Sequence, residues 1–342
     1  MYPLVSVIIL NWNGWKDTLE CLESLYQIKY PNYKVILVDN YSQDQSLKKI
    51  RQYCRGQIPV ETKFFKYQKH NKPIKIREIT NQEADFKETE ANSLDSTNPA
   101  LTLIKNDANY GFALGNNIAM EYTLNKDNPD YILLLNNDTI VTPEFLSEMV
   151  KAGESDEKTG MVGCKLLNAF NPTVIDSTGH VISWGRIVDR GHGEVDKGQY
   201  DEQLEVMGVM AAAALYNKEM LLETGLLDTS YVTLGEDADL SWRAHNQGWK
   251  AIYTPNAIIY HKRGQAITKK DVIPEMTVLS LKNTAEYVSR YGNVKNKLAF
   301  LLLITKEALY VLAGSIIGKN SVSIRKYSST LVKSYSKIIK NI

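Results

Sequence analysis

Three apolar segments of this sequence end abruptly in asparagine and aspartate. Such β-branched runs are typical of strands covered on both faces in a parallel sheet. In open α/β sheets, ligands bind outside the carboxyl ends of the strands, so three polar clusters on one edge indicate a ligand site. Ordinary turn chemistry is the alternative for any single cluster, because Asn and Asp favour turns. The runs and the residues that follow them are 4–10 with Asn11 and Asn13, 34–38 with Asp39 and Asn40, and 131–135 with Asn136, Asn137 and Asp138.

Helical spacing of apolar residues alternates with these runs and predicts the fold class. It occurs over residues 17–26, 116–124 and 143–151, and a fourth apolar run lies at 101–104. The alternation predicts an α/β fold with a Rossmann-like, mainly parallel central sheet flanked by helices. Residues 57–100 break the pattern with Lys, Glu, Asn and Thr, so we expect a lobe or flexible excursion there.

Composition excludes several classes of protein. With 44% hydrophobic and 23% charged residues and a mean hydropathy of −0.29, the 342-residue chain is not disordered throughout, collagen-like or a polytopic membrane protein. A net charge of +1 gives no reason to expect a nucleic-acid partner. Cys21, Cys54 and Cys164 are far apart, which favours a reducing compartment. No secretion signal precedes the first strand, so we expect a cytoplasmic active site.

Two groups of acidic residues are candidates for chemistry. Asp138 follows a buried strand, where a carboxylate can hold Mg²⁺ or Mn²⁺ while substrate phosphates complete the coordination. Farther on, Glu236, Asp237 and Asp239 place three carboxylates within four residues, ahead of a helical pattern. Adjacent carboxylates raise each other's pKa, which is one way to make a general base. The alternative is an acidic helix cap.

Six blocks of sequence occur in the order of a known family. They are residues 7–13, 38–44, 109–117, 135–138, 235–239 and 260–261. Over roughly residues 4–283 they resemble the inverting family 2 glycosyltransferases of the A-type fold, especially the rhamnosyltransferase-like branch. The resemblance implies a UDP- or dTDP-linked sugar donor, a glycan or lipid-linked saccharide acceptor, inversion, and a divalent cation, Mn or Mg. Such enzymes assemble cell-surface polysaccharides or glycoprotein glycans.

The resemblance also implies a role for individual residues. Asp237 stands at the position of the catalytic base, and Glu236 would orient the acceptor. Asp138 would bind the metal together with His261, for which a purely structural role is the alternative. His261 comes just after a short strand that we expect at residues 257–260. Asn136 replaces the first aspartate of the family's Asp-x-Asp. The implied donor-binding residues are Asn11, Asp39, Asn109, Gly111, Asn116, Asn136 and Asp138, and the implied acceptor-binding or orienting residues are Asp239, Trp242 and Arg243.

The end of the sequence suggests a membrane-associated segment. Residues 298–317 are apolar except for Lys306 and Glu307, and two charges at the centre of a spanning helix cost several kcal/mol. We therefore expect a helix on the membrane interface or packed on the domain, with a final core helix as the alternative. Residues 319–342 carry a charge of +6, which leaves the rest of the chain at −5.

These features predict two parts of the chain. Residues 1–292 would form the catalytic domain, and residues 293–342 would attach it peripherally to an anionic membrane. Basic segments beside apolar helices are attracted to anionic head groups. The expected location is thus the inner face of the cell membrane.

Two rival functions differ in their sequence requirements. A sugar nucleotidyltransferase needs a glycine-rich phosphate loop with a basic residue after the first strand, whereas residues 11–15 are Asn-Trp-Asn-Gly-Trp. A non-catalytic module that binds sugar nucleotides or glycans at a membrane would tolerate the loss of the acidic residues at 236–239. Their presence favours an enzyme.

Overall fold

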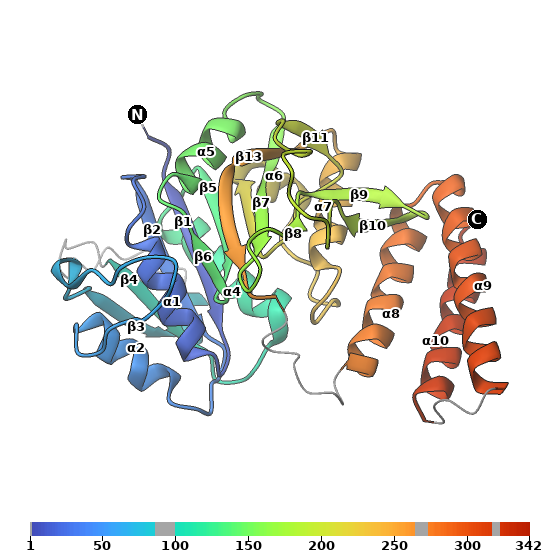
Figure 1. Ribbon diagram of the computed structural model, residues 1–342, viewed down its shortest axis with the longest axis horizontal. Coiled ribbons are helices and arrows are strands. Elements are labelled where there is room, and N and C mark those ends of the chain that lie inside the picture. The colour runs from blue at the N-terminus through green and yellow to red at the C-terminus, as the bar shows by residue number, and fades with distance from the viewer. Residues whose placement is uncertain (1, 86–99, 264–272, 317–321) are drawn as a thin grey trace.

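The computed structural model describes residues 2–85, 100–263, 273–316 and 322–342. A central sheet has helices on both faces, and a layer of helices lies beside it at the C-terminal end of the chain (Figure 1). In the described part the sheet contains 11 strands, and its main path runs β11-β13-β7-β12-β5-β1-β2-β4-β3. The predicted α/β fold with a mainly parallel sheet is confirmed.

The N-terminal half of the sheet is parallel. Its strands are β1 (Val5–Asn11), β2 (Tyr33–Asp39), β3 (Ile76–Thr80), β4 (Leu101–Lys105) and β5 (Tyr131–Asn136). The helices of this half are α1 (Trp15–Leu25), α2 (Ser46–Cys54), α3 (Asn81–Asp85), α4 (Gly111–Lys126) and α5 (Phe145–Gly153), with a short 3₁₀ helix η1 (Lys69–Asn71).

The C-terminal half is mixed. Its strands are β6 (Thr139–Val141), β7 (Thr159–Asn168), β8 (Ile175–Ser177), β11 (Leu204–Val206), β12 (Ala213–Asn217) and β13 (Lys250–His261). A separate hairpin is formed by β9 (His180–Ser183) and β10 (Arg186–Asp189). The helices are α6 (Lys218–Thr224), α7 (Glu236–Asn246), α8 (Ile273–Tyr291), α9 (Val294–Ile316) and α10 (Val322–Ile339).

Alternate residues of β1 face two different apolar cores, as expected for a strand covered on both faces. Val7 and Ile9 pack with the α1 side of the sheet, whereas Ile8 packs with the α4 side. All three side chains are fully buried. A polar side chain at any of these positions would enter one of the two cores, which is why the run is continuously apolar.

Strand register places the polar strand ends side by side. Asn11 pairs in register with Asp39 across β1 and β2, and Leu10 pairs with Asn136 across β1 and β5. Since β12 is antiparallel to both β5 and β7, and β13 is parallel to β7, the end of β13 at His261 reaches the same edge. One edge of the sheet thus collects the clusters predicted from sequence.

Two expectations about the chain need correction. The excursion predicted at 57–100 contains an edge strand, because Ile76–Thr80 pairs in parallel with β4 as β3. Its polar, half-exposed residues concealed this strand from a search for apolar runs, while residues 86–99 lie outside the described part. The short strand expected at 257–260 is the end of the 12-residue β13.

The basic C-terminal segment is largely a helix that packs on its neighbours. Leu331 and Ile338 of α10 are buried with Val288 of α8 and with Phe300 and Ile304 of α9. Residues 317–321, which include the first basic residue of that segment, lie outside the described part. Among the helices described, none is long and apolar enough to cross a membrane. The domain boundary at residue 292 stays a prediction.

Candidate functional site

Asn11 and Asp39 form a hydrogen-bonded pair at the tips of β1 and β2. The Asn11 amide donates to Asp39 Oδ1 at 2.8 Å and to Ser42 Oγ at 3.0 Å. Its carbonyl oxygen accepts from Thr18 Oγ1 at 2.8 Å, and the main-chain N–H of Ser42 donates to Asp39 Oδ2 at 3.1 Å. Because both side chains are almost completely buried, these bonds fix the Asp39 carboxylate in one orientation at the edge of the sheet.

Asn40 connects this pair to the start of α4, and sequence reasoning gave it no role. Its amide donates to Asn109 Oδ1 at 2.9 Å and to the carbonyl of Gly111 at 3.0 Å. Its carbonyl oxygen accepts from the Asn106 amide at 3.0 Å and from the N–H of Tyr110 at 3.1 Å. Its position directly after a buried strand could have identified Asn40 as a site residue from the sequence.

Asn109 and Gly111 therefore lie beside Asn40, whereas Asn116 sits deeper in α4. The Asn116 amide donates to the carbonyl of Phe112 at 2.9 Å, inside its own helix. Gly111 begins the helix with φ +73°, and a Cβ there would lie 2.7 Å from both the carbonyl oxygen and Cγ1 of Val232. The approach of the loop before α7 to the start of α4 thus requires glycine at this position.

Gly111→Ala should destabilise the fold by about 2 kcal/mol or more, because a left-handed conformation and a steric clash act together. Gly248→Ala is the matched control: Gly248 has φ +82°, but no atom lies within 4 Å of the place that an alanine methyl group would take. Unfolding by urea should show a larger loss for Gly111→Ala than for Gly248→Ala. Equal losses would mean that the contact with Val232 does not constrain the start of α4.

Asp138 and His261 meet where β5 and β13 end. His261 Nε2 lies 3.3 Å from Asp138 Oδ1, and His261 Nδ1 lies 2.7 Å from Asp176 Oδ2. Burial lowers the pKa of His261, but the hydrogen bonds with Asp138 and Asp176 outweigh this effect and raise the pKa to about 9. The main-chain N–H of Lys262 donates to the carbonyl of Asp138 at 2.9 Å and holds the two strand ends together.

This donor set fits a divalent cation. A carboxylate oxygen and an imidazole nitrogen converge, and a second carboxylate on the other imidazole nitrogen is the arrangement that orients metal-binding histidines. Asn136 lies half-buried at the same strand end. Within the described residues, no group of three or more His, Cys, Asp or Glu side chains is placed to hold a metal ion. Substrate phosphates would therefore have to supply further ligands, as is common for Mg²⁺.

A chain of alternating charges leads away from Asp176, and none of its members was predicted. Arg263 bonds to Asp176 and to Asp189, each at 2.9 Å. His180 Nε2 lies 3.4 Å from Asp189 Oδ1. Burial lowers the pKa of His180, but Asp189 and the charge of Asp237 raise it above its ordinary value. The network thus extends from the candidate metal ligands toward the first turn of α7.

Glu236 and Asp237 begin α7 but have different surroundings. Asp237 is half-buried, and its carboxylate accepts from the N–H of Ala211 at 3.2 Å and from that of Ala238 at 2.8 Å. Glu236 is buried, and burial and the charge of Asp237 raise its pKa well above the ordinary value. The raised pKa favours a protonated Glu236, which can donate a hydrogen bond, beside the more accessible carboxylate of Asp237.

Asp239, Trp242 and Arg243 lie on the buried side of α7. Arg243 Nε donates to Asp239 Oδ2 at 2.7 Å, and its other nitrogens donate to main-chain carbonyls after α6. Trp242 is buried and packs on Tyr287, with ring centroids 5.8 Å apart. Of the two roles predicted for these residues, their burial favours orienting the helix over contact with an acceptor.

Among the comparisons with known proteins, a family model indicates the family and solved structures indicate the fold. The family model described as "Glycosyltransferase like family 2" matches residues 3–273. The mannosyltransferase PcManGT from Pyrobaculum calidifontis, solved in complex with GDP-Man and Mn²⁺, superposes with a TM-score of 0.53 at 16% identity, covering 100% of this chain and 87% of that chain. GalNAc-T7, solved with UDP, GalNAc and Mn²⁺, gives 0.58 at 14% identity, covering 100% of this chain and 56% of that chain. No curated protein matches the sequence significantly.

Proposed function

The chain belongs to the glycosyltransferase-like family 2, and from this premise we propose that it transfers a sugar from a UDP- or dTDP-linked donor, with inversion, to a glycan or lipid-linked saccharide. It is a glycosyltransferase of the A-type fold that uses a nucleotide sugar. The proposed setting is cell-surface polysaccharide or glycoprotein glycan assembly. The rhamnosyltransferase-like branch stays a prediction from the sequence.

One observation carries the proposal. Strand register brings a polar pair and a candidate metal pair to one edge of the sheet, and a network of charged side chains leads from there toward a candidate base. Asn11 and Asp39 form the polar pair, and Asp138 and His261 form the candidate metal pair. Asp237 is the candidate base, and its charge acts on His180, the last member of the network that begins at His261.

Transfer with inversion is a single displacement at the anomeric carbon. Asp237 would take the proton of the attacking acceptor hydroxyl, which raises the nucleophilicity of that oxygen as the new bond forms. Neutral Glu236 would donate a hydrogen bond and orient the acceptor. A divalent cation held by Asp138 and His261, when bound, supplies positive charge that stabilises the departing diphosphate.

The donor side of the site positions the nucleotide. Asn11 and Asp39 would bind the base and the ribose of the donor. Asn109, Gly111 and Asn116 would lie on the other side of the nucleotide. Asn136 would bridge toward the ribose. Fixing the donor in this way lowers the entropic part of the barrier.

A panel of nucleotide sugars tests the proposal directly. The protein should be stabilised against heat by one class of uridine or thymidine diphosphate sugar in the presence of Mn²⁺, and should slowly hydrolyse that donor. Stabilisation by nucleoside triphosphates together with release of pyrophosphate would instead identify a sugar nucleotidyltransferase. Stabilisation without any hydrolysis or transfer would identify a binding module.

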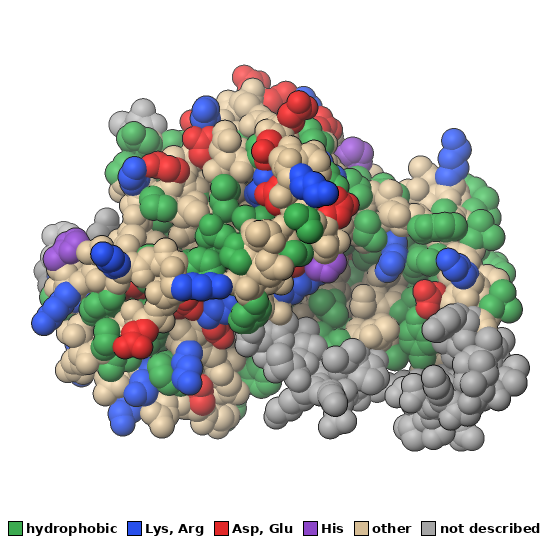
Figure 2. Space-filling view, viewed as in Figure 1, with side chains coloured by type: hydrophobic (Ala, Val, Ile, Leu, Met, Phe, Trp, Pro, Cys, Tyr) green, Lys and Arg blue, Asp and Glu red, His purple; other side chains and the backbone are tan. Residues whose placement is uncertain are grey.

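Exposed apolar side chains on the C-terminal helices support peripheral attachment to a membrane. On α9 they recur at spacings of four and seven residues, and on α10 at spacings of three and four, so each set shares one helix face. Hydrophobic side chains gather over these helices in Figure 2. The exposed residues are Val294, Leu298, Leu302 and Leu309 on α9, and Val332, Tyr335 and Ile339 on α10. We propose that this surface faces an anionic cytoplasmic leaflet.

Replacing Leu298 and Leu302 together by glutamate should reduce binding to vesicles of phosphatidylglycerol and phosphatidylcholine by about tenfold or more, because each buried leucine contributes on the order of 2 kcal/mol. Leu222→Glu on α6 is the control, since Leu222 is 61% exposed outside the helical layer. Co-sedimentation measures the effect. Equal pelleting of the double variant and the control would remove this surface as the membrane contact.

A further inference from the structure

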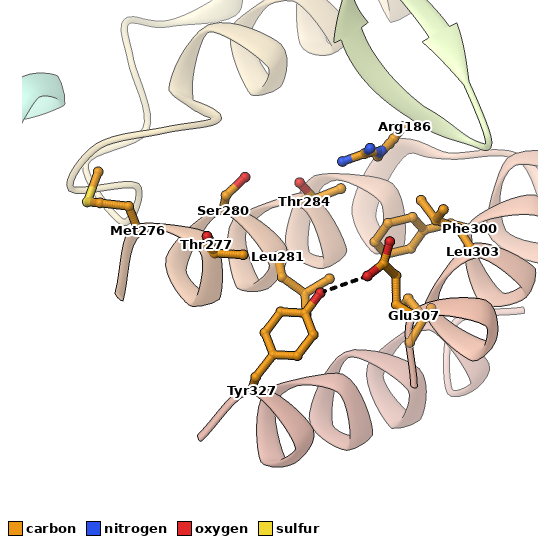
Figure 3. A pocket seen from close by; sticks show the side chains of 11 residues that line it. Arg186, Met276, Thr277, Ser280, Leu281, Thr284, Phe300, Leu303, Glu307 and Tyr327 are labelled. Atoms are coloured by element: carbon orange, nitrogen blue, oxygen red, sulfur yellow. Dashed lines mark hydrogen bonds between the residues drawn. The ribbon is translucent and has the colours of Figure 1, made fainter. Parts of the chain in front are cut away.

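A cavity of about 320 Å³ lies among α8, α9, α10 and the β9–β10 hairpin, away from the site already described. Side chains from all three helices project into it, and Arg186 of β10 reaches it from the hairpin (Figure 3). Its volume falls at the lower end of the range for small-molecule sites. The apolar part of its lining is Met276, Leu281, Phe300, Leu303 and Ile304.

The polar part of the lining carries one positive and one negative side chain, Arg186 and Glu307. Among the described residues, the side chain of Arg186 has no hydrogen-bond or ion-pair partner, whereas that of Arg263 is held by two carboxylates. Glu307 lines another wall and accepts a hydrogen bond from Tyr327 at 3.4 Å, as Figure 3 shows. An unpaired guanidinium beside an apolar wall matches an anion that is attached to an apolar chain.

Packed side chains on α8 connect the cavity with the helix that carries the candidate base. Thr284 lines the cavity, and Tyr287, one turn later on α8, donates to Thr284 Oγ1 at 3.5 Å. Tyr287 packs on Trp242 of α7, the helix that begins with Glu236 and Asp237. Burial raises the pKa of Tyr287 to about 12, and the charges of both Arg186 and Asp237 act on it. A ligand in the cavity would therefore contact α8, which packs on the helix that carries the candidate base.

We propose that this cavity binds the lipid part of a lipid-linked acceptor. The phosphate of that lipid would lie at Arg186, and the first part of its apolar chain would lie along Leu281, Phe300 and Leu303. This inference rests on the proposed function and names the acceptor's chemical class. The helices α9 and α10 that line the cavity also carry the exposed apolar residues proposed to contact the membrane. A glycan without a lipid would leave the apolar walls without a partner.

The two charged side chains of the cavity should have opposite effects on its affinity for dodecyl phosphate. Arg186→Met removes the cation but keeps an apolar side chain of similar length, and should weaken binding of dodecyl phosphate by about tenfold or more. Glu307→Gln removes the repelling carboxylate and should strengthen that binding by about threefold. Lys282→Met on the exposed side of α8 is the matched control and should bind as the unmodified protein does.

Isothermal titration of the full-length protein with dodecyl phosphate below its micellar concentration measures these effects. Dodecanol and inorganic phosphate, titrated separately, should each bind at least about tenfold more weakly than dodecyl phosphate. Dodecanol lacks the phosphate, and inorganic phosphate lacks the apolar chain. Ser280→Trp fills the cavity from its rim and should abolish binding. Unchanged affinity in both Arg186→Met and Ser280→Trp would overturn the proposal, as would equal affinity for inorganic phosphate and dodecyl phosphate.

Failure of the proposed function would be seen in a different measurement. Hydrolysis of nucleotide sugars by the unmodified protein involves no lipid and no cavity residue. Absence of hydrolysis and transfer with every donor would remove the glycosyltransferase mechanism while leaving the dodecyl phosphate titration intact. Loss of the titration signal with donor hydrolysis retained would remove only the acceptor site.

Discussion

Asp237→Asn should lower the rate of sugar transfer by at least about a hundredfold, and up to about ten-thousandfold, while the affinity for the nucleoside diphosphate stays within about twofold. The amide is isosteric with the carboxylate, so it can still accept a main-chain hydrogen bond from Ala211 or Ala238. It cannot take a proton from the acceptor hydroxyl. The turnover number measured with saturating donor, together with UDP binding by calorimetry, separates these two quantities.

Two further variants make the assignment of the base specific. Glu236→Gln should cost much less than Asp237→Asn, because burial and the charge of Asp237 raise the pKa of Glu236 and favour the neutral form that donates a hydrogen bond. Glu219→Gln alters an exposed acid in the first turn of α6 and should have no effect on transfer. Near-normal turnover in Asp237→Asn would remove it as the base. A larger loss in Glu236→Gln than in Asp237→Asn would exchange their roles.

Asp138→Asn should abolish high-affinity binding of Mn²⁺ in the presence of UDP and lower transfer by about a hundredfold or more. The substitution removes the negative charge and leaves only the imidazole of His261 as a strong ligand from the protein. Mn²⁺ binding can be followed by electron paramagnetic resonance of the free ion, which does not depend on activity. The heat stability that UDP and Mn²⁺ add together should fall to that given by UDP alone.

The neighbouring carboxylates provide controls for the metal assignment. Asp176→Asn should weaken Mn²⁺ binding about tenfold or more, since Asp176 orients His261 without being a ligand itself. Asp130→Asn alters an acid just before β5, at the opposite end of that strand from Asp138, and should leave Mn²⁺ binding unchanged. Unchanged Mn²⁺ affinity in Asp138→Asn would mean that the ion binds elsewhere or is not used.

Local sequence was sufficient for the strands that form the centre of the sheet. Residues 4–10 and 131–135 are apolar almost without interruption, and only a strand covered on both faces uses such a run without exposing half of it. The predicted ends differ from those of β1 and β5 by one residue at most. Strand β3 escaped detection because an edge strand needs few apolar residues, and Arg77 and Glu78 are exposed.

The candidate site was predictable to the extent that its residues follow strands or start helices. Asp39, Asp138 and Asp237 each stand at such a position, and Asn40 could have been assigned on the same grounds. The contact between His261 and Asp176 could not be predicted from the sequence. Asp176 is 85 residues away from His261 and lies on a three-residue strand. No local periodicity marks so short a strand as part of a site.

By itself, the sequence determined the parallel core and the residues at its carboxyl edge, because apolar runs and the polar residues after them are local patterns that strand geometry turns into positions. The tertiary structure alone decided which of these residues touch, and it added Asp176, His180 and Arg263 to the site. It also decided that the basic C-terminal segment packs as α10 and encloses a cavity at Arg186. Contacts between distant segments depend on the path of the whole chain, which cannot be read from any short segment of the sequence.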